Sequence, residues 1–469
     1  MSPRMAQYGM LWRAALGRVH PHALRLLPWV AVLVTLAIAA LAGAMQGPWA
    51  ALRSGWNAAF GCALVVWSVG YLPGASKLNT PANAHLVPGM RARLVELGVV
   101  IWLACIAGLA IGSVGQPFDT ALTVTWAMLA SLGIGLSAAG SGWGAAILIA
   151  IWPLMGFRSI VPEWAQAMMA QPAFLPSVAV ALALPGVAAI RTMFPRGGDR
   201  HWRMAAIRSP WLDKDPFGTR NSLGFTRWWQ AYSLRRALGR RDLGSLLLHG
   251  AGPGLHLSGI ALGIGLTGVL AAVSIAFAHW SGLGVLLKLL AEIGWILGVL
   301  PILMFQMHTM LLAGLGETPA GQSLLRLAPA MPATAPGFNR LLATSVLRSS
   351  LAAWTLAVAM AVLCAWASGA GSNEMTIIVS LCCLALPILV VPLYNQARRP
   401  RYNPVLQWLL AIALAGACLL LAVGFRYVLN FPVFPTAAAL TIVLTAVLAI
   451  GRVGAMIRAP FALPAGRLD

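Results

Sequence analysis

The sequence predicts an all-α, polytopic membrane protein of about twelve transmembrane helices. Its 469 residues are 59% hydrophobic and only 9% charged, with a mean hydropathy of +0.81. That composition leaves too few polar groups to solvate a soluble globule. Several apolar runs also approach or exceed the roughly 20 residues that a helix needs to cross a bilayer. Finally, the basic residues fall almost entirely into alternate connections between these runs, as they do in membrane proteins.

The expected spans are helices, because an unpaired backbone group in lipid is costly and the alternating pattern of a barrel strand is absent from the sequence. The first run follows a long basic segment and shows no cleavage pattern, so it is expected to be a retained span. The twelve predicted spans are Leu26–Met45, Trp56–Pro73, Leu94–Gly112, Asp119–Ala138, Trp143–Phe157, Phe174–Ile190, Leu255–His279, Leu283–Leu311, Leu351–Ser368, Met375–Asn395, Val405–Gly424 and Val433–Ile450.

The distribution of Lys and Arg predicts the orientation. With the N-terminus inside, the cytoplasmic segments hold 28 basic residues, and the outside connections hold only Arg53, Arg158 and Arg426. Basic loops resist translocation, so both termini are expected in the cytoplasm. The net charge of +21 is then explained by cytoplasmic retention and contact with anionic lipid, and a nucleic-acid partner is not expected. The expected location is a bacterial inner (plasma) membrane.

An internal duplication is predicted from short matches that recur in the same order. Residues 13–18 and 235–240 agree at five of six positions. Further matches follow the second and eighth spans, where Thr-Pro-Ala precedes a Pro-x-Met segment, and open the sixth and twelfth spans. Because each copy holds an even number of spans, the two copies are expected to be parallel repeats. The predicted domains are residues 1–195, a cytoplasmic linker at 196–224, and residues 225–469.

Each copy is expected to begin with an amphipathic helix in the cytoplasmic interface. Aromatic residues in both helices share one face at helical spacing, with arginines nearby. Such a helix places its rings in the headgroup boundary and its guanidinium groups toward phosphate. Packing against a neighbouring helix is the alternative interpretation. The residues concerned are Tyr8 and Trp12 in the first copy and Phe225, Trp228, Trp229 and Tyr232 in the second.

Catalytic chemistry is not expected of this chain. None of its three lysines follows a glycine, so the Gly-Lys phosphate cradle of a Walker A loop is absent from the sequence. The six cysteines all fall inside predicted spans and form no metal-ligand spacing. The chain is therefore predicted not to be an enzyme and to bind no cofactor or metal.

The intramembrane polar residues are the candidate functional positions. Lys288 and Glu292 lie one helical turn apart in the eighth span and can neutralise each other. Three interpretations stay open: an interfacial neutralising pair, a polar site in a translocation path, and a structural pair between helices. His308 lies near the cytoplasmic end of the same span.

The layout resembles the permease subunits of type-2 ATP-binding-cassette (ABC) exporters. Those subunits have an interfacial helix, six spans, a coupling loop between spans two and three that docks on the ATPase, and a re-entrant segment between spans five and six. The resemblance implies coupling loops at Leu78–Leu94 and Gly316–Leu342, and a matching polar connection at Arg158–Pro172. The candidate coupling residues are Leu86, Val87, Met90, Arg91, Leu324, Leu325, Arg326 and Leu327.

This resemblance implies the membrane component of an exporter, which forms a translocation path and couples to a separate ATPase subunit. The expected partners are that ATPase and the lipid bilayer, and a homodimer is compatible with the sequence. Two alternatives stay open: a secondary transporter resembling the major facilitator class, and a membrane scaffold without transport activity. The facilitator class usually needs buried carboxylates, for which Glu292 is the one candidate, and its Asp-Arg-x-Gly-Arg signature is missing between the second and third spans.

Overall fold

The structure is a computed structural model of the full chain. It describes residues 3–19, 26–80, 83, 87, 89–113, 117–138, 143–144, 146–147, 163–195, 224–251, 280, 319–326, 328–367, 369–398 and 404–464.

The chain divides into two compact units, Met1–Lys214 and Asp215–Asp469. The division falls inside the segment 196–224 that the sequence predicts as a linker. All regular elements in the described residues are helices, so the all-α prediction is confirmed for that part of the chain. Among the same residues, nine helices are long and apolar enough to cross a membrane. They correspond to nine of the predicted spans, and the other three lie almost wholly outside the described residues.

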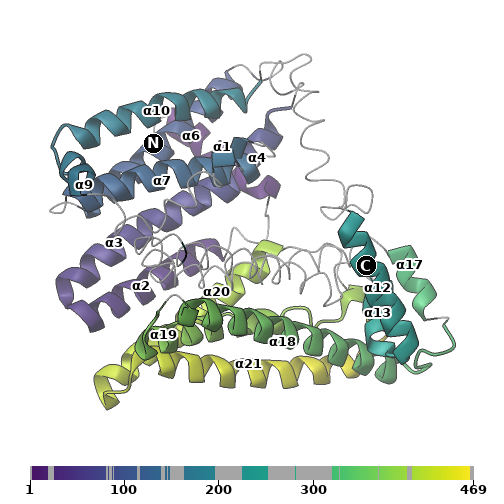
Figure 1. Ribbon diagram of the computed structural model, residues 1–469. Helices are drawn as coiled ribbons and strands as arrows, with labels where there is room; N and C mark the ends of the chain where they lie inside the picture. Colours follow the sequence, from purple (N-terminus) through teal and green to yellow (C-terminus); the bar gives the residue numbers. More distant parts are fainter. Residues whose placement is uncertain are drawn as a thin grey trace. The chain divides into compact units, whose positions relative to one another are not determined.

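Unit 1 is a bundle of long helices that begin and end close to the predicted positions (Figure 1). Span two is longer than expected: it starts at Pro48 and continues through a π-helical stretch, η2, into α4. The elements are α1 (Pro3–Val19), α2 (Leu27–Gln46), α3 (Pro48–Val65), η2 (Val66–Tyr71), α4 (Leu72–Leu78), α6 (Met90–Gly112), α7 (Pro117–Ala138), α9 (Glu163–Met169) and α10 (Phe174–Thr192).

A single glycine turns the chain between the first two spans. Gly47 has φ +95° and ψ 177°, a conformation available essentially only to glycine. Pro48 follows at the first position of α3, where its missing N–H costs nothing and its fixed φ suits a helix. The turn lets α2 and α3 pack along their length, with small residues such as Gly43 and Ala51 at the contact.

The core of unit 1 lies between α6, α7, α10 and the η2–α4 part of span two. Its largest fully buried side chains are Trp67, Tyr71, Trp102 and Phe194. Each buried indole or phenol needs a hydrogen-bond partner, and Trp102 Nε1 donates to Ser131 Oγ on α7 at 2.9 Å. The bond ties the third span to the fourth.

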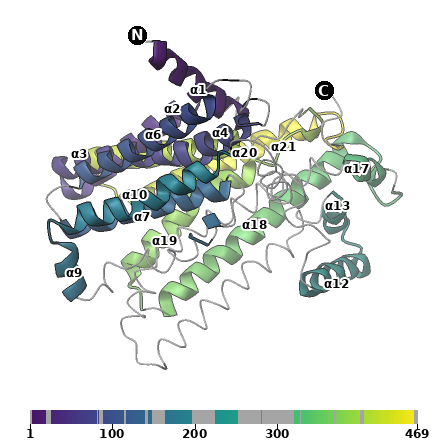
Figure 2. The same ribbon diagram turned by 90° about the horizontal axis from the view of Figure 1, so that it is seen from above.

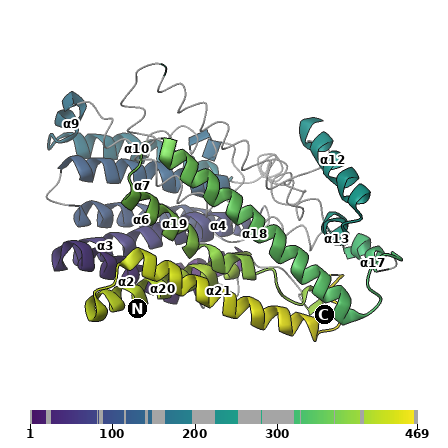
Figure 3. The ribbon, with the colours of Figure 1, turned by 60° about the horizontal axis from the view of Figure 1, so that its bottom comes forward.

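Unit 2 has its described helices grouped around α18 and α21, with α13 and α17 at the N-terminal end of α18 (Figure 3). The elements are α12 (Gly224–Arg240), α13 (Leu243–Ala251), α17 (Pro319–Leu325), α18 (Ala335–Ala367), α19 (Ser372–Leu384), η5 (Leu386–Val390), η6 (Gln396–Arg398), α20 (Pro404–Leu429) and α21 (Val433–Ile457).

Among the described residues, α18 is the longest helix, with 33 residues. At 1.5 Å per residue it spans roughly 50 Å, well beyond about 30 Å of hydrocarbon. A row of alanines at every fourth position, Ala353, Ala357, Ala361 and Ala365, is at most 2% exposed. Small residues let helix backbones approach closely in a membrane, which explains the tight packing of α18 on α19 and α21. Trp354 Nε1 also donates to the Cys382 carbonyl on α19 at 3.0 Å.

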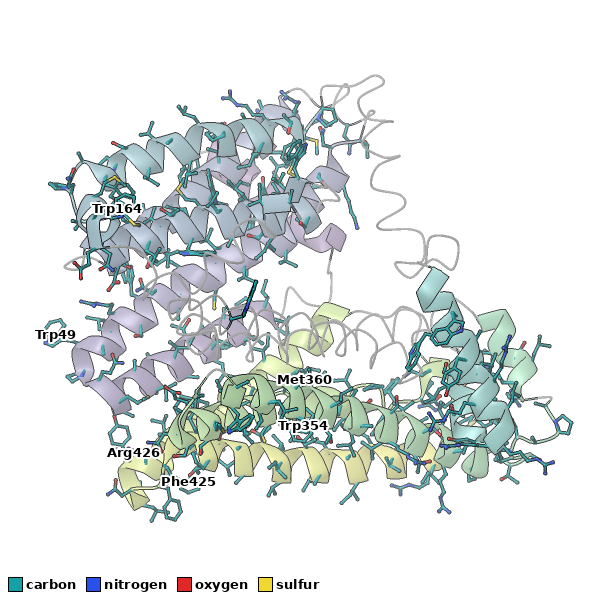
Figure 4. All side chains as sticks on the ribbon, in the orientation of Figure 1. Trp49, Trp164, Trp354, Met360, Phe425 and Arg426 are labelled. Carbon is teal, nitrogen blue, oxygen red and sulfur yellow. The ribbon has the colours of Figure 1, made fainter. Side chains whose placement is uncertain are left out.

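The exposed surface of the spans is apolar along its length and aromatic at its ends. On α21, Val443, Val447 and Ile450 are 63%, 62% and 75% exposed, which is the expected state of lipid-facing residues. Figure 4 shows Trp49 and Trp164 at the same end of unit 1, and both side chains are largely exposed. Tryptophans gather at membrane–water interfaces. Length, composition and surface together indicate an integral membrane protein.

Candidate functional site

The N-terminal helix α1 packs on the end of spans two and three of its own unit, and it runs at an angle to them (Figure 2). The ring of Trp12 stacks on Tyr71 with 5.0 Å between ring centroids. Tyr8 donates to the Glu96 carboxylate at 2.7 Å, and Ala15 and Leu16 are buried. The two aromatic residues predicted for the interface therefore contact spans two and three directly.

The π-helical stretch of span two supports this contact. Trp67 Nε1 donates to the Gly98 carbonyl at 2.8 Å, and the Tyr71 hydroxyl donates to the Leu94 carbonyl at 2.7 Å. The two rings and the two carbonyls are each one turn apart, so span two holds α6 at successive turns. π-helical stretches are rare and often occur at functional sites. Gly70 lies beside Leu16 of α1, where an added Cβ would come within 2.7 Å of Leu16 Cδ2.

The first predicted coupling loop is attached to the short segment that follows α10. Asn79, which follows α4, donates through Nδ2 to the Pro195 carbonyl at 3.0 Å. Arg91, in the first turn of α6, donates through Nε to the Phe194 carbonyl. Both sides of the loop are thereby bonded to the short segment that follows α10, whose Phe194 side chain is fully buried.

Unit 2 contains the corresponding attachment. Asn339, in the first turns of α18, is completely buried. Its Nδ2 lies 2.9, 3.1 and 2.9 Å from the carbonyl oxygens of Met456, Ala459 and Pro460, and its Oδ1 accepts from the Ala462 N–H at 2.8 Å. A buried amide with donors and acceptor all satisfied fixes one geometry. The start of α18 is thus bonded to the end of α21 and to the segment that follows it.

Aromatic contacts add to this second attachment. Phe338 packs edge-on against Phe461, with ring centroids 5.7 Å apart. The guanidinium carbon of Arg326 lies 3.8 Å from the centre of the Phe461 ring, within the range of a cation–π interaction. Arg326 was predicted in the second coupling loop, and it contacts the segment after the last span.

The two attachments share a sequence motif that the sequence analysis missed. Residues 88–91 are Pro-Gly-Met-Arg and residues 336–339 are Pro-Gly-Phe-Asn. The third residue of each motif is buried and the fourth donates to the backbone after the last span of its unit. The match predicted from the sequence instead pairs residues 88–90 with residues 329–331, which lie in the loop ahead of α18. The repeated Pro-Gly dipeptide at a helix start was the signal available in the sequence.

The other candidate coupling residues differ in exposure. Val87 and Leu324 are 44% and 66% exposed, so each predicted loop presents a large apolar side chain. Met90 is 8% exposed and packs inside unit 1, and Leu325 packs against Gly250 of α13. Leu86 and Leu327 lie outside the described residues, as do the intramembrane candidates Lys288, Glu292 and His308.

The helix predicted to lie in the interface of the second copy, α12, packs against α13. Trp228 and Tyr232 are 58% and 45% exposed, and their rings stack at 5.9 Å, as do those of Trp229 and Tyr232. The Ser233 hydroxyl lies 3.5 Å from His249 Nε2 on α13. Burial lowers the pKa of the His249 imidazole, so that ring is neutral at pH 7. The side chain of Phe225 lies outside the described part of the structure.

Neither metal-binding residues nor likeness to other proteins indicates a function for this chain. Among the described residues, no cluster of three or more His, Cys, Asp or Glu side chains could hold a metal ion. Five cysteines in these residues are free thiols. No protein-family model, curated protein or solved structure matches the chain.

Proposed function

We propose that this chain is the membrane permease component of an ABC-type exporter, which forms a translocation path and couples to a separate ATPase. The observation that carries the proposal is the attachment of each predicted coupling loop to the last span of its unit. A loop that receives force from an ATPase must be bonded to the helices that it moves. Arg91 and Asn339 provide such bonds.

Two parallel six-helix copies with cytoplasmic termini are part of the proposal. The Pro-Gly motif, the bond that follows it and a tryptophan bond from the third span to the fourth recur in the same order in both units. Trp102 donates to α7 and Trp354 to α19. In both units the third span packs against the fourth and the last spans. Recurrence of bonds at matching places favours duplication over chance likeness.

The exposed apolar residues supply the docking surface in this proposal. Val87 and Leu324 each lie close in sequence to arginines, Arg91 and Arg326 respectively. An exposed apolar side chain surrounded by polar ones is the usual anchor of a protein interface, which the partner buries in a pocket. On the predicted topology both loops face the cytoplasm, where a soluble ATPase is available.

Force on the first loop would move spans two, three and six together. At the loop, α6 is bonded to the segment that follows α10, and α6 is also bonded to span two at Leu94 and Gly98. A displacement of the loop is then shared by spans two, three and six as a group, since packed helices shift as discrete bodies rather than deform continuously. α1 joins this group through Trp12.

Co-purification tests the proposal. The full chain is co-expressed with its genomic neighbours, solubilised gently and captured by a tag. Wild-type protein is expected to retain an ATPase, and V87D combined with L324D is expected to lose it while inserting normally. The matched control is V428D, an equally drastic change at a position 79% exposed near the end of α20 that the topology places outside. Met90 is unsuitable for this test because its side chain is buried.

Two results would count against the proposal. Wild-type protein that retains no ATPase would refute coupling to one and would bring the secondary-transporter interpretation forward. Equal retention by V87D/L324D and V428D would refute docking through the two loops.

A further inference from the structure

A pocket of about 460 Å³ in unit 2 opens between the segment that follows η5 and the last turns of α21. Three arginines line it: Arg398 from η6, and Arg452 and Arg458 from the end of α21. Tyr394 and Asn395 complete its polar lining. The lining residues that the structure describes include no acidic side chain, so the pocket carries a formal charge of +3 from its arginines.

The half-buried arginine of the pocket, Arg452, is hydrogen-bonded to the backbone. Arg452 Nη1 donates to the Val390 carbonyl at 3.0 Å, and this bond anchors the guanidinium beside the pocket. An arginine carries five N–H donors, and those on Nε and Nη2 of Arg452 have no partner among the described residues. The anchoring bond therefore leaves donors for a ligand.

Asn395 adds an unsatisfied donor. Its Oδ1 accepts from the Ala397 N–H at 3.2 Å. This bond sets the orientation of the side-chain amide, so the remaining polar atom is the Nδ2 donor. Nδ2 is buried and has no hydrogen-bond partner among the described residues. Buried donors are nearly always satisfied in proteins, and an exception needs an explanation such as an absent ion.

We propose that this pocket binds a phosphate group. The lining offers three guanidinium groups and an amide N–H, which are donors, against a single phenol that can also accept. A phosphate group has several acceptor oxygens and pairs with guanidinium groups through two parallel hydrogen bonds. A carboxylate has only two oxygens and would leave more of these donors unpaired. The phosphate is that of an anionic phospholipid headgroup or of a soluble phosphate compound.

The position of the pocket suits both sources. It lies where α19 and α21 reach the end of their spans, the level of lipid headgroups, and the predicted topology makes this end cytoplasmic. Basic pockets between spans on the cytoplasmic side are where anionic headgroups bind. This inference is independent of the exporter proposal, because it needs neither an ATPase nor transport.

Binding to the purified full chain in detergent tests the inference. The probes are inorganic phosphate and dioctanoyl phosphatidylglycerol, each titrated by calorimetry and checked by native mass spectrometry. Arg398→Gln removes one exposed charge and should weaken binding roughly fivefold. Asn395→Asp replaces the orphan donor with a carboxylate of the same shape and should weaken it by about tenfold or more. The matched control is Arg426→Gln, because Arg426 is an exposed arginine of the same unit that does not line the pocket.

The outcomes distinguish the sources. Binding of phosphatidylglycerol that both pocket variants weaken and Arg426→Gln leaves unchanged supports a headgroup site. The same pattern with inorganic phosphate alone supports a soluble phosphate compound. The inference is overturned if neither probe binds the wild-type chain, or if both pocket variants bind as well as the control. Since Arg398→Gln is an exposed substitution, its fold is expected to be intact, and the test does not depend on Asn395→Asp alone.

Discussion

Replacing Asn339 should break the attachment between the start of α18 and the end of α21. The Asn339 amide carries two N–H groups shared among three carbonyl oxygens, and its Oδ1 accepts from the Ala462 N–H. Two donated bonds and one accepted bond are then lost in Asn339→Ala. At a net value of about 1 kcal/mol each, the expected loss of stability is about 3 kcal/mol.

Asn339→Asp separates hydrogen-bond direction from packing. The aspartate has nearly the same shape and can still accept from the Ala462 N–H, but it turns an oxygen toward three carbonyl oxygens. Burying an unpaired charge among acceptors is strongly destabilising. We therefore expect Asn339→Asp to destabilise the protein more than Asn339→Ala does, although the alanine removes more atoms.

The assay is unfolding of the purified full chain in mixed micelles, titrated with SDS and followed by tryptophan fluorescence. The matched control is Asn373→Ala, because Asn373 is exposed at the start of α19. Exposed substitutions of this kind usually change stability by less than about 0.5 kcal/mol. Unfolding of Asn339→Ala at the same SDS concentration as the control would contradict this prediction. A smaller loss of stability in Asn339→Asp than in Asn339→Ala would also contradict it, because the attachment would then not stabilise unit 2 through these bonds.

Three other predictions follow from the same structure. Trp12→Ala removes the ring stacked on Tyr71, so limited proteolysis should cut α1 faster in this variant than in the wild type. Trp12→Phe should keep most of the protection. Equal cutting of the wild type and both variants would contradict the contact. Because burial lowers the pKa of His249, the unfolded chain binds more protons than the folded one below about pH 6.5, the ordinary histidine value. Stability should therefore fall as the pH drops through that range and should fall less in His249→Gln; identical pH profiles would rule out the titration. In a cysteine-free background, a cysteine at position 426 should react with an impermeant reagent from outside and one at position 215 should not, and the reverse pattern would invert the topology.

Local features of the sequence predicted the helical fold well. Whether a segment such as Val433–Ile450 spans a bilayer depends on its own length and composition, and α21 contains it entirely. Span ends were less accurate where a helix continues past the apolar run. α18 starts at Ala335, well before the predicted Leu351, because Arg340 and Arg348 are good helix formers even where they leave the hydrocarbon.

The attachments could not be predicted in the same way. Arg91 bonds to Phe194, which lies 103 positions along the chain, and Asn339 bonds to residues more than 110 positions away. A Pro-Gly dipeptide lies ahead of each of these polar residues, with one residue between, but nothing local indicates which backbone carbonyl each one bonds. The exposure of the loop residues could not be predicted either. Met90 and Val87 are both apolar and lie three residues apart, but only Val87 is exposed. Which of them is buried depends on α10 and the segment after it.

The last turn of α21 and the segment after it contribute both to the Asn339 attachment and to the proposed phosphate pocket. Asn339 bonds to the carbonyls of Met456, Ala459 and Pro460, and the same three residues line the pocket that also holds Arg458. A ligand in the pocket and the start of the ninth span therefore contact one short stretch of backbone. If a bound phosphate favours one position of that stretch, the bonded α18 must favour the matching position, and by linkage a displaced α18 must alter phosphate affinity by the same factor. The predicted coupling loop ahead of α18 is thus the part of unit 2 on which a headgroup or soluble phosphate would act most directly.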